Sequence, residues 1–203
     1  AVTVGSGNIT VNSAVTTNAG DIGIVSASDL IVNADITTGA TAGATLADLI
    51  ARAGSITRTG GTVTAGNVAV AATGGIGLAA ANARLRTSTS NVQIGGLTVN
   101  GTAVNNAGDD FIENVGSVPL VVAGVSATGN LDVSQTGANV TIGSLTIGAF
   151  APAGASSAAS VTSATQTGLT AVAANKSVSV VTQTSGDILV NNAVTTNAGS
   201  VGL

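Results

Sequence analysis

One phrase of eleven residues occurs three times in this chain and constrains the fold more than any other feature. The copies span residues 7–17, 28–38 and 186–196, and the first two start 21 residues apart. Each copy places apolar residues two positions apart before an Asn and ends in a Thr-Thr pair. A short fixed period is typical of proteins in which each repeat buries its apolar residues against the next repeat. The phrase therefore predicts a stack of similar coils.

One period of the pattern contains three short strands separated by turns. Ile9 and Val11 share one face of the first strand, because the side chains of a strand alternate between its two faces. Val15 lies in the second strand, and residues 21–25 form the third. Asn, Ser and Gly residues, which are common in turns, separate the three. We expect an all-β chain, a parallel β-helix or β-solenoid of about 21 residues per three-strand coil with loops at the corners.

Stacked coils place equivalent residues above one another, and the phrase predicts which side chains meet. The expected pairs are Ile9 with Leu30, Val11 with Val32, Asn12 with Asn33, and Val15 with Ile36. The third copy supplies Ile188, Val190, Asn191 and Val194 at the same positions. Stacked Asn side chains can pass amide hydrogen bonds from coil to coil. We interpret these residues as a structural ladder that needs no ligand.

A second, longer period is nested around the first. Residues 6–24 align with residues 185–203 at an offset of 179, with 13 identities in 19 positions. We therefore expect one β-solenoid segment over 1–203, in which 6–184 form one long repeat block and 185–203 begin the next. At about 21 residues per coil the block would hold roughly eight or nine coils. The pattern predicts a tandem array that continues in a longer polypeptide.

The composition excludes several classes of protein. Hydrophobic residues make up 44% of the chain and mean hydropathy is +0.55, which argues against disorder. Gly, Thr, Asn and Ser interrupt every apolar stretch, so no transmembrane segment is expected, and no signal peptide is recognisable. Five basic residues in 203 are too few for nucleic-acid binding. Without His, Cys or Tyr the usual nucleophile–base pairs cannot be assembled, so we expect no enzyme and no cofactor.

The densest acidic cluster is the one candidate for a metal or catalytic site. Asp109, Asp110 and Glu113 could hold Ca²⁺ together with backbone carbonyls, or act as a carboxylate pair on a glycan. A groove that also contained Arg84 or Arg86 would favour a carbohydrate-binding or carbohydrate-cleaving β-helix. The repeat pattern of calcium-binding solenoids is absent, and we expect both arginines to face solvent. We interpret the cluster as a solvated acidic loop, with no catalytic residue and no metal.

Two further patterns concern charged and Thr residues. Arg52 and Arg58 are candidates to pair with Asp48 or Asp35. The Thr pairs 57/59, 62/64 and 87/89 have the spacing of an outward Thr-x-Thr face, which would suit an ice- or crystal-binding solenoid. These pairs do not recur at one coil offset, so this function is an alternative and not the main hypothesis.

A family resemblance rests on the run from Ala47 to Leu78. It contains Ala-Gly-Ser-Ile-Thr-Arg-Thr-Gly-Gly and then Gly-Asn-Val-Ala-Val-Ala-Ala-Thr-Gly-Gly-Ile-Gly-Leu. This run resembles the repeat region of filamentous haemagglutinin-type exoproteins, which are large adhesins that Gram-negative bacteria export by two-partner secretion. The resemblance implies a right-handed parallel β-helix, an extracellular location at the bacterial cell surface, and an adhesive or scaffolding role.

Together these observations predict a structural rod segment of a large secreted fibre or adhesin. Its expected partners are copies of itself or adjacent repeats along the fibre axis, and host or neighbouring cell-surface glycans. The alternatives are a carbohydrate-binding or carbohydrate-cleaving β-helix and an ice- or crystal-binding solenoid.

Overall fold

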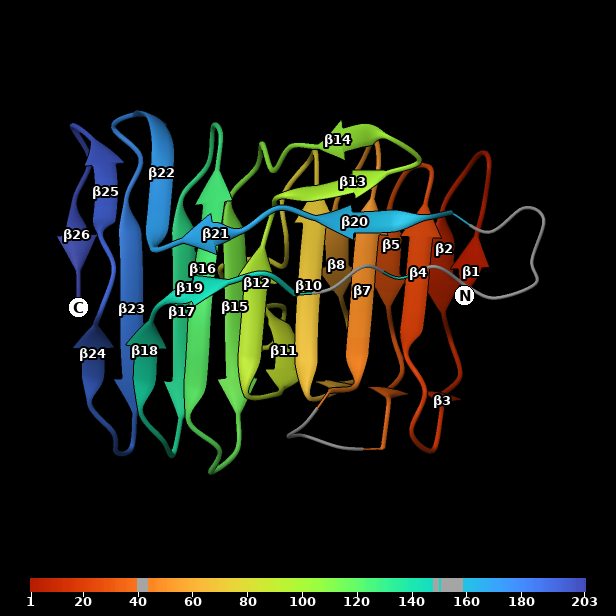
Figure 1. Cartoon of the computed structure of the whole chain (residues 1–203), viewed down its shortest axis with the longest axis horizontal. Coiled ribbons are helices and arrows are strands. Elements are labelled where there is room, and N and C mark those ends of the chain that lie inside the picture. The colour runs from red at the N-terminus through yellow and green to blue at the C-terminus, as the bar shows by residue number, and fades with distance from the viewer. Residues whose placement is uncertain (40–43, 148–149, 151–158) are drawn as a thin grey trace.

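The computed structural model describes residues 1–39, 44–147, 150 and 159–203. In these residues all regular structure is β, and the two largest sheets are built from parallel strands (Figure 1). The prediction of an all-β chain with parallel stacking is confirmed. The strands lie across the long axis of the molecule, with the two chain termini towards its opposite ends (Figure 1).

One face of the molecule is a ten-stranded sheet. Its strands are β1 (Val2–Thr3), β4 (Ile22–Ser26), β7 (Leu46–Ala51), β10 (Asn67–Ala72), β12 (Asn91–Ile94), β16 (Leu120–Ser126), β18 (Val140–Ile142), β22 (Leu169–Ala174), β24 (Ile188–Val190) and β25 (Val194–Asn197). The first half of β16 pairs with β18, and its second half pairs with β22. The sheet therefore divides into two narrow ribbons towards the C-terminal end.

The opposite face is an eight-stranded sheet with a three-stranded sheet beside it. The eight strands are β3 (Val15–Thr16), β6 (Ile36–Thr37), β9 (Val63–Thr64), β11 (Leu85–Ser88), β15 (Asp110–Val115), β17 (Leu131–Thr136), β23 (Val178–Gln183) and β26 (Val201–Gly202). The other three are β2 (Ile9–Val11), β5 (Leu30–Val32) and β8 (Ile56–Arg58). Single bridges from Ile56 to Ile76 and from Ile76 to Asp110 link β8 to β15, so this face is divided at the N-terminal end instead.

The chain passes alternately through the two faces, and we call one passage through both a coil. The 21-residue spacing is confirmed where Ile9 pairs with Leu30. It lengthens to 26 residues between Leu30 and Ile56 and to 30 between Asn91 and Val121. Along the ten-stranded sheet, six steps lead from β4 through β7, β10, β12, β16 and β18 to β24, and half a coil more leads to β26.

The space between the two faces is filled by a narrow aliphatic core. Its members are buried Val, Ile, Leu and Ala residues from every coil, such as Ile24, Leu49 and Ile112. These side chains point inward from both sheets because they alternate with the outward residues of each strand. Aromatic residues are not needed, since the core is only a few side chains thick.

An antiparallel layer lies outside the ten-stranded sheet. It consists of β13 (Leu97–Val99), β14 (Thr102–Val104) and β20 (Val161–Ser163), and a smaller pair, β19 (Ser144–Leu145) and β21 (Gln166–Thr167), continues it. These strands run across the strands behind them (Figure 1). We call β13, β14 and β20, together with Ile147, Phe150 and Ala159, the lateral cover.

Candidate functional site

The predicted ladder of the first two coils is present. Ile9 pairs with Leu30, Val11 with Val32, and Val15 with Ile36. Asn33 Nδ2 donates to Asn12 Oδ1 at 2.8 Å, so the Asn stack carries the expected amide hydrogen bond. In the third copy of the phrase, Ile188 and Val190 pair with Val140 and Ile142, and Val194 pairs with Leu169. Asn191, next in the chain, is exposed.

A second ladder runs along the corners and was not predicted in this form. Side-chain oxygens at strand openers accept hydrogen bonds from the backbone N–H groups of the following coil. The bonds are Asp29 N to Asn8 Oδ1, Leu46 N to Asp21 Oδ1, Ser55 N to Asp29 Oδ1, Asn130 N to Asp109 Oδ1, Ser177 N to Asn130 Oδ1, Asp187 N to Asn139 Oδ1 and Ser200 N to Ser177 Oγ. These bonds satisfy backbone donors where the sheets turn, and four of the seven are partly buried, where an unpaired donor would be costly.

The acidic cluster is part of this architecture. Asp110 and Glu113 lie in β15, so the predicted acidic loop is wrong: the segment is a strand. Asp110 faces the interior and is buried, whereas Glu113 faces outward and pairs with Arg86 at 2.9 Å. Asp109 lies at the corner, 3.5 Å from the Lys176 amine. The three carboxylates therefore lie in three different environments and do not form one site.

The arginines also have structural partners. Arg84 binds Asp132 at 2.6 Å and lies over the Phe111 ring at 5.7 Å, and only 13% of its side chain is exposed. The prediction that Arg84 faces solvent is therefore wrong. Arg58 donates to the carbonyl oxygens of Gly61 and Asn82 rather than to a carboxylate, because its side chain lies across the corner turn.

A short row of polar side chains crosses the interior near the corner. Thr87 Oγ1 donates to Asn114 Oδ1 at 2.7 Å, and Asn114 Nδ2 donates to Gln135 Oε1 at 2.6 Å. All three residues are buried, and so is Thr89. The 87/89 pair is thus an interior feature, because both side chains are buried, and it cannot form part of an outward Thr face.

The lateral cover gives the ten-stranded sheet a second buried face. Its Leu97, Val99 and Val161 form a cluster with outward residues of the sheet, including Leu46 and Ile50. Gln93 fixes it by hydrogen bonds, because Gln93 Oε1 accepts from the Ile147 N–H and Gln93 Nε2 donates to Ser163 Oγ.

Gly23 marks the tightest approach of the cover to the sheet. A Cβ atom on Gly23 would lie 2.6 Å from the ring of Phe150. A larger residue at this position would have to displace the Phe150 ring.

Asp48 lies in the buried layer between the sheet and the lateral cover. Alternation along β7 places it on the same face as Leu46 and Ile50, and it is 0% exposed. Neither carboxyl oxygen has a hydrogen-bond partner within the described part of the chain. Burial raises the pKa of Asp48 to about 8, and the nearby Asp21 carboxylate adds to the rise. Among the described residues Asp48 has no ion pair with an arginine, and a pKa of about 8 means that its carboxyl group is mostly protonated at neutral pH.

Two signals in the sequence indicate the lateral cover, although the repeat pattern does not. Asn100-Gly101 separates two alternating apolar runs, which is a strong hairpin signal, and both residues have positive φ. Residues 46–51 are apolar at nearly every position, which is typical of a strand buried on both faces.

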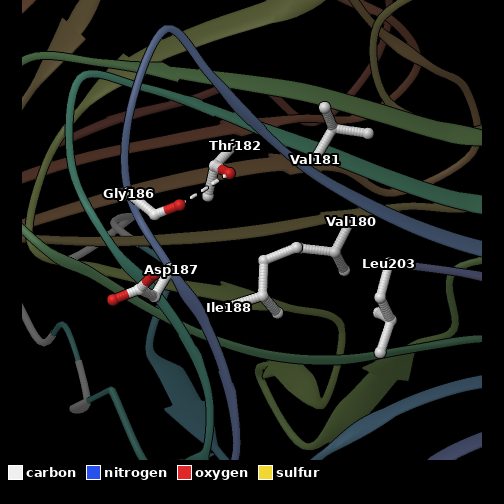
Figure 2. A pocket seen from close by; sticks show the side chains of 7 residues that line it. All are labelled: Val180, Val181, Thr182, Gly186, Asp187, Ile188 and Leu203. Carbon is white, nitrogen blue, oxygen red and sulfur yellow. Dashed lines mark hydrogen bonds between the residues drawn. The ribbon is translucent and has the colours of Figure 1, made fainter.

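Within residues 1–203, the first and last coils each have one side that no other coil covers. At the C-terminal end, Val180, Ile188 and Leu203 converge on a cavity of about 540 Å³ (Figure 2). At the N-terminal end, Val2, Ile9 and neighbouring residues line one of about 310 Å³. Both cavities are the exposed cross-section of the aliphatic core. Ladder residues border both cavities: Ile9, Val11, Asn12 and Val15 at the N-terminal end, and Ile188 at the C-terminal end.

The described residues show neither a metal centre nor a membrane anchor. No three His, Cys, Asp or Glu side chains within 1–39, 44–147, 150 and 159–203 are grouped to hold a metal ion. Those residues also form no helix that could span a membrane. No family model matches the chain, and searches of curated proteins and of solved structures find no significant match either. The feature that the described residues present most clearly is the stack of parallel-paired coils.

Proposed function

We propose that this chain is a right-handed β-solenoid and serves as a rod segment of a large secreted bacterial fibre or adhesin. The observation that carries the proposal is the unbroken parallel pairing of both faces from one end to the other. Each coil bonds to the next through its backbone, through the corner ladder and through the core. Such a stack is stiff along its axis and can be lengthened by adding coils.

The side chains support a mechanical role. Glu113 and Asp109 form ion pairs with basic residues of neighbouring coils, and Asp110 is buried. The stacked polar side chains form hydrogen bonds with one another. We assign no glycan site, because Asp110 faces the interior while Glu113 is paired with Arg86 on the outside. Few Lys, Arg and aromatic residues are available to proteases, which suits a location outside the cell.

Chains of one, two and four blocks, joined at the 179-residue offset, test the proposal by small-angle X-ray scattering and electron microscopy. Six and a half coils at about 4.8 Å each predict a rod that grows by about 31 Å per added block. A length that does not increase in equal steps would contradict a rod. Antibody labelling of intact source cells checks the extracellular location, and labelling only after lysis would contradict it.

A further inference from the structure

The two copies of the 19-residue segment have the same local structure. In each copy a bent pair of short strands precedes a straight strand: β2, β3 and β4 in residues 6–24, and β24, β25 and β26 in residues 185–203. Thr17 Oγ1 donates to the Gly20 carbonyl, and Thr196 Oγ1 donates to the Gly199 carbonyl in the same turn. Local sequence therefore determines the bend.

The two copies nevertheless lie on opposite faces of the molecule. The bent pair belongs to the eight-stranded face in the first copy and to the ten-stranded face in the second. The straight strand changes sides in the reverse direction, from the ten-stranded sheet to the eight-stranded sheet. The cause is the half-integral number of coils, because six and a half coils bring the chain back to the same sequence half a turn further round the axis.

We infer that the edge formed by β24, β25 and β26 is the docking surface for a second copy of this block, rotated by half a turn about the rod axis. The inference rests on the proposed rod function and specifies how its blocks are joined. The coil seated on the edge is the equivalent of residues 25–51 in the next copy. The lateral cover then lies on alternate sides of the fibre in successive blocks.

The apolar residues of the edge support this occupant. Val190 and Val201 stand at the positions of Val11 and Ile22 in the alignment. Val11 is 6% exposed and Ile22 is 4% exposed, because the following coil covers them, whereas Val190 and Val201 are 50% and 46% exposed. A coil of the same sequence would bury them in the same way.

The polar residues of the edge match the same occupant. Asp187 and Asn191 correspond to Asn8 and Asn12. In the first coil, Asn8 Oδ1 accepts from the Asp29 N–H at 3.1 Å, and Asn12 Oδ1 accepts from Asn33 Nδ2 at 2.8 Å. The carboxylate of Asp187 and the amide oxygen of Asn191 can accept the same two bonds from a second copy.

The alternating cover also gives a reason for the glycine at position 202. Gly202 corresponds to Gly23, where the Phe150 ring leaves no room for a Cβ. At Gly202 nothing lies within 4 Å of the position a Cβ would take. After a half turn, the lateral cover of the next block would lie on the eight-stranded side and place its equivalent of Phe150 over Gly202.

A distance measurement on a two-block chain tests the half turn. Residues 1–203 are followed by a second copy of residues 25–203, and Thr102 of each block is replaced, Thr102→Cys, to carry a spin label. The chain has no other Cys, and Thr102 is exposed on β14 of the cover. With sheets and cover about 10 Å apart, labels on opposite sides would lie about 43 Å from each other, and labels on one side about 31 Å.

Distances from double electron–electron resonance, together with X-ray scattering on the same sample, distinguish the possible results. The half turn is supported by a distance of about 43 Å or more together with a rod lengthened by about 31 Å. A distance near 31 Å in an equally long rod would overturn the half turn and leave the rod function intact. A rod that does not lengthen would overturn the proposed function and the docking surface with it. The labelled one-block chain is the control for distances between molecules.

Discussion

Replacing Asp48 by Asn should stabilise the protein at neutral pH and leave it almost unchanged in acid. In the folded chain burial raises the pKa of Asp48 to about 8, from the ordinary value of 3.8. Between these two values the unfolded chain has lost the proton while the folded chain retains it, so the free energy of unfolding falls as pH rises. The slope for one such group is about 1.4 kcal/mol per pH unit.

The magnitude at pH 7 follows from the 3.2 pH units between 3.8 and 7, which amount to about 4 kcal/mol. The Asp48→Asn side chain cannot ionise, and its amide is as poorly hydrogen-bonded as the protonated carboxyl group that it replaces. The variant should therefore exceed the original chain in stability by about 4 kcal/mol near pH 7 and match it near pH 4. Asp110, whose pKa burial also raises to about 8, keeps part of the pH dependence in the variant.

Urea denaturation at several pH values measures this difference, with Asp35→Asn as the matched control. Asp35 is exposed, and an amide oxygen at this position can still accept the bond from the Thr62 N–H. The free energy of unfolding of the control should depend on pH as it does in the original chain, whereas that of Asp48→Asn should depend on pH less steeply. If the pH dependence of Asp48→Asn also matches that of the original chain, the carboxyl group is not held protonated beneath the cover and the argument fails. Hydrogen exchange of β13 and β20 provides an independent check, since ionised Asp48 should loosen the cover only in the original chain.

Further substitutions test the packing and the ladders. Gly23→Ala should destabilise the chain by about 1–3 kcal/mol through the clash with Phe150, while Gly202→Ala in the one-block chain should have little effect on thermal melting. Asn114→Ala removes a buried amide between Thr87 and Gln135 and should lower the free energy of unfolding by about 3 kcal/mol or more. Asn33→Ala, at an exposed position, should lower it by about 1 kcal/mol. Equal losses in urea denaturation would contradict the argument from burial. Arg84→Ala removes a partly exposed ion pair and should cost about 1 kcal/mol, and salt should reduce the loss.

The repeated phrase was sufficient to predict the stacking, but not the number or shape of the coils. It predicted the pairs Ile9–Leu30 and Val11–Val32 and the Asn12–Asn33 bond, because like residues meet in any parallel stack of equal coils. Later coils lengthen at their corners, where the corner ladder needs only one side-chain oxygen and tolerates extra residues. A period of 21 therefore does not extend through the whole block.

The expectations for Asp48 and Arg84 are wrong for different reasons. Asp48 was expected to pair with an arginine, and Arg84, which is next to Leu85, was expected to face solvent. Arg84 is instead covered by Asp132 and Phe111 of the neighbouring coils. Asp48 is instead buried by the lateral cover, a layer formed by residues more than 40 positions later in the chain. The packing of the lateral cover on the sheet determines whether such a side chain is charged. This contact joins distant parts of the sequence, so a local sequence pattern cannot predict it.

The parallel stack accommodates insertions without losing its register. The chain leaves the ten-stranded sheet after Ile142 and returns at Leu169, yet both residues continue pairing along the same strand, β16. The register of the parallel pairing is unaffected because each coil needs only its neighbours. Insertions can therefore extend from the surface without disrupting the pairing between coils. The lateral cover consists of insertions that pack against the outer face of the ten-stranded sheet. In the proposed fibre, a half turn between blocks would distribute such insertions over both sides.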